Sequence, residues 1–333
     1  MHVKIVENGI SNTGVDITSL GLGGAPLSAF LFDVDENVAI DTIQKAFQLG
    51  IRYFDTAPYY GFGRGERRCG RALAEFRRTD FKISTKIGRV LIPADLDAPD
   101  DGFVPHELDA VPDYTRDGVM RSIDESLRRL HMDHLDIVYI DDPNSNFQQA
   151  IDESLPALHE LKSQGIISAI GVGMNQWEML DLFVRECRLD CILLAGRYTI
   201  MDCSALPVLL PRCEKMGTKV ILGAPYNNGV LCSDLSQNNY YYTSRESNRV
   251  PLPMDKLELA QNIKIICQSY AVPLKAVALQ FGLAHPAVIS TIPGSVTSDE
   301  IQDNFKMINY PIPPDLWREL KHENLLPPEA PTH

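Results

Sequence analysis

No run of the 333-residue sequence reaches the roughly 18 apolar residues that a membrane-spanning helix needs. The chain also lacks a basic excess, because 31 lysines and arginines stand against 44 aspartates and glutamates, a formal charge of -13. This balance argues against nucleic acid as a partner and against an anionic membrane surface. Glu7 lies where an export signal needs its apolar core, so we expect a cytoplasmic protein.

Cysteine is present, but it lacks the spacing of a metal or redox motif. None of the seven cysteines forms a C-x-x-C pair, and no nearby ligand completes a zinc set around Cys187 and Cys191. We therefore expect reduced thiols that pack as small apolar residues, and no metal site. The length allows two domains, or one domain of a long type such as an α/β barrel.

Eight short runs rich in Val and Ile recur along the chain, each bounded by Gly or Pro. Their nearly continuous apolarity is typical of parallel strands that are covered on both faces. The predicted strands are Leu20–Ala25, Tyr53–Ala57, Phe81–Ile87, Leu135–Ile140, Ile167–Val172, Cys191–Ala195, Lys219–Gly223 and Val288–Ile292.

Segments with helical periodicity separate these runs. Asp35 is a good N-cap for the first segment, and Ser298 opens a helix after the eighth strand. The clearest predicted helices are Glu36–Leu49, Gly65–Phe76, Tyr114–Leu130, Ala150–Gln164, Gln176–Cys187, Ala205–Met216 and Met254–Tyr270.

Eight βα units predict an α/β fold, a (β/α)8 TIM barrel, formed by a single domain over residues 1–333. The alternative, a doubly wound open sheet, would carry a G-x-G-x-x-G turn after its first strand. Neither glycine cluster fits that turn, because Pro26 and Glu66 occupy the positions of the third glycine. The open-sheet alternative therefore loses its main support.

Further segments lie outside the repeat. Val3–Val6 and Val15–Thr18 flank turn residues, which predicts a short hairpin before the barrel, a lid on its N-terminal end. Leu91–Asp113 and Ser233–Pro253 predict long loops over the C-terminal face, where such loops often cover a site. The Pro-rich stretch from Pro311 onward predicts a terminal extension.

Charged residues interrupt the predicted strands at their C-terminal ends, where such barrels carry their chemistry. Asp55, Lys86 and Asp141 lie there. Because a buried charge is costly unless it is paired, we expect an ion pair between Asp55 and Lys86. A cation near Tyr60 would lower its pKa from about 10 and suit it to proton transfer in alcohol/carbonyl chemistry. The alternative is an ion pair that only plugs the barrel mouth.

These residues stand in motifs that resemble the aldo-keto reductase superfamily. Asp55-Thr56-Ala57-x-x-Tyr60-Gly61 is followed by Ser84-Thr85-Lys86-Ile87-Gly88, and the similarity continues in order through residues 170–172, 224–229 and 292–304. Arg89 and residues 195–199 resemble the branch that holds aldose (fucose or galactose) 1-dehydrogenases and pyridoxal 4-dehydrogenase. The resemblance implies NAD(P)-linked hydride transfer, with Tyr60 as general acid/base, Lys86 lowering its pKa and Asp55 holding Lys86.

The sequence lacks the fourth member of that family's tetrad, a His at the end of the fourth strand. Asp141 stands in its place. A protonated Asp141 could donate a hydrogen bond to a substrate oxygen, whereas an ionised one could not. Burial, Asp55 and Asp142 would raise the pKa of Asp141 and Lys86 would lower it, and the sequence leaves this balance open.

Three residues near these strand ends are candidates for substrate contact. Tyr59 and Asp142 adjoin the catalytic candidates, and His106 lies in the first long loop, from which it could fold back over the site.

The resemblance also implies where a dinucleotide binds. Gly294 and Glu300 match the Lys and Arg that grip the 2′-phosphate in NADP-preferring members. Glu300 would repel that phosphate and accept hydrogen bonds from ribose hydroxyls, so we expect NAD to be favoured over NADP. Alternatively, Glu300 is only a good residue for a helix N-terminus. The candidate cofactor residues are Gly24, Asp55, Asn175, Tyr226, Asn227, Asn228, Gly229, Pro293, Gly294, Ser295, Thr297, Glu300 and Asn304.

The predicted function is an NAD(P)-dependent oxidoreductase that acts on a sugar-like or other small carbonyl/alcohol substrate, as a monomer or small homo-oligomer. The altered tetrad keeps an alternative open: C=C reduction, non-redox chemistry, or cofactor binding without ordinary carbonyl reduction.

Overall fold

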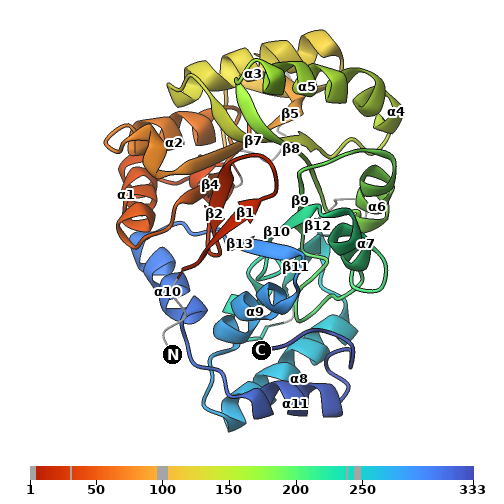
Figure 1. Cartoon of the computed structure of the whole chain (residues 1–333). Coiled ribbons are helices and arrows are strands. Elements are labelled where there is room, and N and C mark those ends of the chain that lie inside the picture. The colour runs from red at the N-terminus through yellow and green to blue at the C-terminus, as the bar shows by residue number, and fades with distance from the viewer. Residues whose placement is uncertain (1–4, 31, 96–103, 238, 244–248) are drawn as a thin grey trace.

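A barrel of parallel strands forms the centre of the computed structural model, which describes residues 5–30, 32–95, 104–237, 239–243 and 249–333 (Figure 1). Within this part of the chain, eight strands follow the order β13-β10-β9-β8-β7-β5-β4-β3, and helices surround them. Parallel bridges from Leu20 to Thr291 and from Gly23 to Gly294 join the two edge strands. The predicted (β/α)8 barrel is confirmed.

All eight predicted barrel strands are present, three of them with the predicted bounds. Three of the others, β5, β7 and β8, extend beyond the prediction at their C-terminal ends, because backbone pairing with neighbouring strands continues past the apolar run. The barrel strands are β3 (Leu22–Gly23), β4 (Tyr53–Asp55), β5 (Lys82–Pro93), β7 (Leu135–Asp141), β8 (Ile167–Met174), β9 (Cys191–Ala195), β10 (Lys219–Gly223) and β13 (Val288–Ile292).

The predicted helices are also present, with ends that shift by a few residues. Asp35 caps α1 by accepting hydrogen bonds from two backbone N–H groups, and Thr297, not Ser298, caps α10. The fourth predicted helix begins as a π-helical turn, Ala150–Ser154. The helices are α1 (Glu36–Gln48), α2 (Arg64–Leu73), α3 (Arg116–Leu130), α4 (Phe147–Gln149), α5 (Leu155–Ser163), α6 (Trp177–Glu186), α7 (Leu209–Met216), α8 (Met254–Ser269), α9 (Leu274–Phe281), α10 (Ser298–Ile308) and α11 (Pro314–His322).

Besides the short α4, which precedes the fourth predicted helix, sequence analysis missed two of these helices, α9 and α11. Six of the eight residues of α9 are buried, so its sequence shows no polar face from which a helical period could be read. The predicted terminal extension instead forms α11, which begins at Pro314, a position where proline suits the first helical turn. α11 packs against α8 below the barrel in Figure 1.

A hairpin closes the N-terminal end of the barrel, as predicted. Its strands are β1 (Glu7–Ile10) and β2 (Val15–Thr18), so the first strand lies four residues later than predicted, and residues 3 and 4 fall outside the described part. Ile17 is fully buried with Ile10, in one apolar cluster with interior residues of the barrel such as Ile137 and Ile221. The hairpin therefore plugs the end opposite the predicted site.

Both predicted long loops contain strands. β5 runs on past the barrel rim and pairs antiparallel with β6 (Leu108–Asp113), which makes an arm over the C-terminal face. In the second loop, β11 (Tyr241–Thr243) pairs with β12 (Arg249–Pro251). The sequence predicted long loops at these places but not the paired strands within them, in which antiparallel pairing satisfies backbone groups.

Three further findings bear on function. All seven cysteines are free, and five of them are buried. Across the described residues, no three His, Cys, Asp or Glu side chains gather in a way that could hold a metal ion. In the same part of the chain, no helix has the length and apolarity needed to cross a membrane.

Candidate active site

The predicted ion pair is present at the C-terminal ends of β4 and β5. Lys86 Nζ lies 2.8 Å and 3.0 Å from the two carboxylate oxygens of Asp55 and 2.9 Å from the carbonyl oxygen of Thr56. Lys86 and Asp55 are only 3% and 2% exposed. Burial alone would lower the pKa of Lys86, but the charges of Asp55, Tyr60 and Asp141 hold that pKa well above its usual range. Lys86 is therefore a fixed cation at the barrel mouth.

Tyr60 lies beside this cation, in the turn between β4 and α2. The Lys86 ammonium lies 4.6 Å from the centroid of the Tyr60 ring. The turn is fixed at Gly61, whose φ is +61° and where any side chain would collide with the carbonyl of Ser28.

The predicted direction of the Tyr60 pKa needs correction. Lys86 does lower it, but burial raises it more, and Asp55 and Asp141 raise it further, so the phenol has a pKa above its usual value. Tyr60 thus holds its proton in the free protein.

Asp141 ends β7 on the same rim of the barrel. Burial, followed by the charge of Asp142, raises its pKa to about 7, against the opposing effects of Lys86 and Arg89. The pKa of Asp142 is also raised, by burial. The hydroxyl of Tyr114 donates to the backbone carbonyls of Asp141 and Asp142, at 2.6 Å and 3.0 Å, which fixes this strand end. The balance that the sequence left open therefore falls toward a carboxyl group that protonates near neutral pH.

A buried chain of hydroxyl groups supports Asp55 from inside the barrel. Ser84 donates to Asp55 at 2.6 Å, and Tyr53 lies 3.0 Å from both Ser84 and the hydroxyl of Tyr139. All of these side chains are buried. This chain holds the Asp55 carboxylate in one orientation toward Lys86.

The three predicted substrate residues have different neighbours in the structure. Tyr59 packs edge-on against Phe62 at 6.0 Å, and Asp142 adjoins Asp141. His106 stacks on Phe62 at 3.9 Å, and its ring nitrogens face Val104 O and an Asp109 carboxylate oxygen. His106 thus lies one ring beyond Tyr59, as part of the wall that the arm forms.

The segment after β10, predicted to lie under a pyrophosphate, has an unusual backbone. Ala224, Asn227, Asn228 and Gly229 all have positive φ, between 47° and 85°. Among the described residues, the backbone N–H groups of Asn228 and Gly229 have no hydrogen-bond acceptor, and the buried side-chain oxygen of Asn227 has no donor. Free N–H groups in such turns suit an anion, so this segment fits the phosphates of a dinucleotide.

The predicted adenosine side of the cofactor site lies next to that segment. The Tyr226 hydroxyl donates to Asn304 at 2.6 Å, and the Asn304 amide donates to Ser295 at 3.0 Å. These bonds join the loop after β10 to the segment between β13 and α10. Thr297 and the N-terminus of α10 adjoin them.

The remaining cofactor candidates lie where the barrel closes. Gly24 N donates to Asp55 O, Gly23 N donates to Pro293 O, and Gly294 packs against Pro26. Glu300 accepts a hydrogen bond from Val296 N at 2.6 Å. One of its carboxylate oxygens therefore has a structural role at the helix start.

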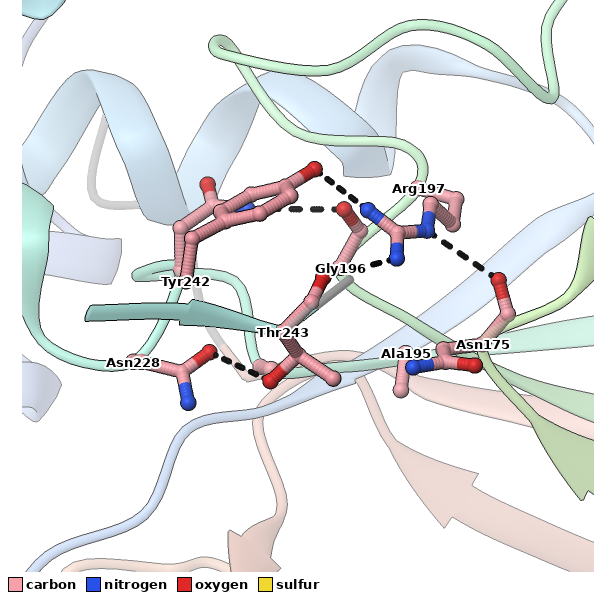
Figure 2. Close-up of a pocket in the computed structure, with 9 residues that line it drawn as sticks. Asn175, Ala195, Gly196, Arg197, Asn228, Tyr242 and Thr243 are labelled. Atoms are coloured by element: carbon pink, nitrogen blue, oxygen red, sulfur yellow. Dashed lines mark hydrogen bonds between the residues drawn. The ribbon is translucent and has the colours of Figure 1, made fainter. Parts of the chain in front are cut away.

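Asn175, Asn227 and Asn228 line one small cavity of about 40 Å³, together with Arg197, Tyr242 and Thr243 (Figure 2). Thr243 donates to the side chain of Asn228 at 3.0 Å. The structure thus brings three predicted cofactor residues together and adds the hairpin β11–β12 as a wall of their cavity.

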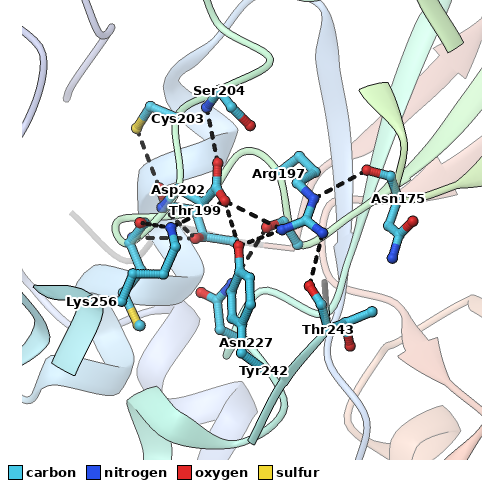
Figure 3. A network of polar contacts seen from close by, with 12 residues as sticks. Asn175, Arg197, Thr199, Asp202, Cys203, Ser204, Asn227, Tyr242, Thr243 and Lys256 are labelled. Atoms are coloured by element: carbon cyan, nitrogen blue, oxygen red, sulfur yellow. Dashed lines mark hydrogen bonds and ion pairs between the residues drawn. The ribbon is translucent and has the colours of Figure 1, made fainter. Parts of the chain in front are cut away.

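A buried polar network attaches this hairpin to the barrel (Figure 3). The Arg197 guanidinium donates to Asn175 O, Thr243 O and the Tyr242 hydroxyl, and it pairs with Asp202. Burial alone would raise the pKa of Asp202, but hydrogen bonds from Ser204 and Tyr242 and the charge of Lys256 lower it to about 2. We call Arg197, Asp202 and Tyr242 the hairpin latch.

Comparison with known proteins decides the family. The sequence pattern of the aldo/keto reductase family matches residues 19–324. The chain belongs to this family. It is accordingly an oxidoreductase acting on CH–OH or carbonyl groups, and its family uses a nicotinamide cofactor.

Two relatives in this family match almost end to end. D-threo-aldose 1-dehydrogenase from a Pseudomonas species is 33% identical over 96% of this chain and 98% of its own. Pyridoxal 4-dehydrogenase from Microbacterium luteolum is 32% identical over 98% and 100%. The holo form of an aldo-keto reductase from Bacillus halodurans has a TM-score of 0.76 at 21% identity, covering 99% and 98%. That last likeness supports the fold.

Sequence analysis of this aldo/keto reductase missed several residues of the site. Ser84 lies two residues before Lys86, and alternate residues of a strand point to the same face. The sequence could therefore have indicated that Ser84 faces Asp55 as Lys86 does. Tyr114 and Tyr242 of the hairpin latch could not be found this way, because their partners lie 27 to 45 residues away in sequence and on other elements.

Proposed function

We propose that this aldo/keto reductase transfers a hydride between a bound nicotinamide dinucleotide and a carbonyl or alcohol carbon of a small hydroxylated substrate. Tyr60 is the general acid and base. The observation that carries the proposal is the Lys86 ammonium, held by Asp55 and lying 4.6 Å from the Tyr60 ring.

The residues of the chain handle the proton. The nicotinamide ring, when bound, supplies or accepts the hydride. In reduction, Tyr60 gives its hydroxyl proton to the substrate oxygen, and Lys86 stabilises the phenolate that forms. In oxidation, the same phenolate takes the proton from the alcohol. Asp55 keeps Lys86 charged, and Ser84 orients Asp55.

Asp141 takes the place of the missing His. Below its pKa of about 7 the carboxyl group is protonated and can donate a hydrogen bond to the substrate oxygen. Above that pH it would repel negative charge developing on the same oxygen. We therefore assign Asp141 the role of a substrate-orienting donor with a pH-dependent strength.

The substrate class is proposed from the relatives. By their names, these relatives act on D-threo-aldoses, pyridoxal and, in Arabidopsis thaliana, L-galactose. All three contain hydroxyl groups as well as the reacting group, and the paired carboxyl groups of Asp141 and Asp142 can bind hydroxyl donors. We propose an aldose or a similar hydroxylated carbonyl compound.

For the cofactor, we propose a preference for NAD over NADP. Glu300 uses one oxygen at the helix start, and its negative charge remains near the proposed adenosine site. Replacing Gly294 by Lys to attract a phosphate would be a poor test, because a Cβ there would lie 2.5 Å from the ring of Pro26. Glu300→Gln is the cleaner variant, and it should lower the dissociation constant for NADP(H) more than that for NAD(H).

A second candidate function follows from Asp141 itself. A protonated carboxyl group could also assist C=C reduction, or the site could have lost ordinary carbonyl chemistry. One assay in both directions separates these options. Wild-type protein is mixed with NAD or NADP and with aldoses or pyridoxal, and separately with NADH or NADPH and with simple aldehydes or enones, and the absorbance of the reduced cofactor is followed. Turnover of carbonyl substrates supports the main proposal. Turnover of enones alone supports C=C reduction. Cofactor binding without turnover in either direction contradicts the main proposal and supports the loss of ordinary carbonyl chemistry.

A further inference from the structure

Arg89 is a partly buried cation that makes no hydrogen bond or ion pair with the described residues, although its guanidinium lies over the Tyr59 ring. Its Nε is buried and makes no hydrogen bond. Among the described arginines that are not solvent-exposed, Arg89 alone contacts no oxygen acceptor. The others are bonded, for example Arg68 to two backbone carbonyls, Arg129 to Glu66 and Arg197 within the hairpin latch.

A buried guanidinium without an acceptor lowers the stability of the fold, so a role in stability does not explain Arg89. A buried N–H without an acceptor loses its hydration and gains nothing in return. The chain carries 44 acidic residues, so counter-ions are abundant, yet none of the described carboxylates lies within ion-pair distance of Arg89. An unsatisfied donor of this kind indicates an acceptor that arrives from outside the protein.

The position of Arg89 points to the active site. It lies three residues after Lys86 on β5, beyond Gly88, whose φ of +107° turns the strand at the rim. Its guanidinium lies 4.6 Å from the centroid of the Tyr59 ring, next to Tyr60 in sequence. It is also close enough to Asp141 and Asp142 to lower the pKa of both carboxyl groups.

The charges around Arg89 favour a neutral ligand. Lys86 and Arg89 carry two positive charges, against which stand Asp55, Asp141 and Asp142. A carboxylate or phosphate ligand would meet repulsion from Asp142, and also from Asp141 above its pKa of about 7. A hydroxyl group has no such conflict, because its oxygen accepts from the guanidinium and its proton can be donated to a carboxylate.

We propose that Arg89 is a specificity-determining residue, which donates hydrogen bonds to hydroxyl oxygens of a neutral polyhydroxylated substrate while Asp142 accepts from the same hydroxyl groups. The inference rests on the proposed function and narrows its substrate class. Arg89 and Asp142 then select aldoses over carbonyl compounds that lack hydroxyl groups.

The first measurement is stability. Arg89→Met removes the charge and the fork but keeps much of the volume, and Arg188→Met is the control at an exposed arginine before β9. Removal of Arg89 relieves the cost of a buried N–H without an acceptor and loses the contact with the Tyr59 ring. These effects oppose each other, so the Tm should change little. A clear fall in Tm for Arg89→Met but not for Arg188→Met would assign Arg89 a structural role and overturn the proposal.

The second measurement is ligand affinity, by calorimetric titration of Tyr60→Phe protein saturated with NADH, in which turnover is blocked. Galactose is the neutral probe and galacturonate the anionic one. Adding Arg89→Met should weaken galactose binding about tenfold to a hundredfold, the effect of one charge-assisted hydrogen bond. The galactose affinity of the Arg89→Lys variant should lie between those of the parent protein and the Arg89→Met variant. Arg188→Met should leave the galactose affinity unchanged.

Three results would overturn the inference. These are unchanged galactose affinity in Arg89→Met, no binding of galactose to the parent protein, or tighter binding of galacturonate that depends on Arg89. Failure of the proposed function looks different, because wild-type protein would then neither reduce NAD or NADP with an aldose nor oxidise NADH or NADPH with a carbonyl compound. Turnover of simple aldehydes without galactose binding would refute the inference alone.

Discussion

At the residue scale, the chemistry of the site depends on which side chains at the C-terminal rim of the barrel carry a proton. Tyr60 holds its proton, Lys86 holds its charge, and Asp141 protonates near neutral pH. The sequence located all three residues, since each lies at or just after the C-terminal end of a predicted strand. It could not give their protonation, because burial and the spacing of charges across neighbouring strands decide the pKa values.

Asp141→Asn should stabilise the protein in a pH-dependent way. The pKa of Asp141 is raised above its unfolded value, so the stability contributed by this group is present at acid pH and is lost as pH rises through about 7. We expect the Tm gain of Asp141→Asn over wild type to be small at pH 4 and largest at pH 8. Calorimetric melting across this range is the measurement, with exposed Asp16→Asn as control. A gain that is independent of pH would contradict the raised pKa.

At the scale of elements, the strands were easier to predict than what lies between them. A strand covered on both faces needs a continuous apolar run, which the sequence shows directly. The arm β5–β6 and the hairpin β11–β12 are held by pairing and by polar side chains at the rim, which leave no such run. This is why the candidate residues on strands were found, whereas the hairpin latch was not.

The hairpin latch should slow cofactor release. Tyr242→Phe removes a hydroxyl group that bridges Arg197 and Asp202, a contact to charged groups that contributes about 1.5–3 kcal/mol. We expect NADH to dissociate roughly tenfold faster in a displacement experiment followed by fluorescence. Tyr241→Phe is the matched control, because Tyr241 is 45% exposed and its ring lies against the Arg249 guanidinium and outside the hairpin latch. Equal dissociation rates in the two variants would show that the hairpin does not cover the cofactor.

The N-terminal hairpin should matter for stability and not for the site. Ile17 is fully buried at the bottom of the barrel, so Ile17→Ala should reduce the free energy of unfolding by about 2–5 kcal/mol. The dissociation constant for NADH should stay the same, because the hairpin lies at the opposite end from Lys86. Val6→Ala, at a side chain that is 51% exposed, is the control for denaturant unfolding. A changed cofactor affinity in Ile17→Ala would contradict this separation.

At the scale of the whole molecule, one closed barrel connects every part of the site. β3 pairs with β4 and bridges to the segment around β13, so the proposed cofactor residues near Gly294 and the ion pair at β4 and β5 belong to one sheet. We therefore predict that residues 1–333 unfold as a single domain. Differential scanning calorimetry should show one transition, which shifts upward as a whole when NADH is added. Two separable transitions would contradict the single domain.

Proton transfer by Tyr60 is the central claim, and single-turnover kinetics of Tyr60→Phe test it most directly. A carbonyl substrate that the wild type reduces is mixed with enzyme preloaded with NADH, and NADH absorbance is followed, while cofactor affinity is measured by fluorescence titration. The account predicts a loss of hydride transfer of at least about a hundredfold with an NADH dissociation constant close to that of wild type. Hydride transfer at the wild-type rate in Tyr60→Phe would contradict the account.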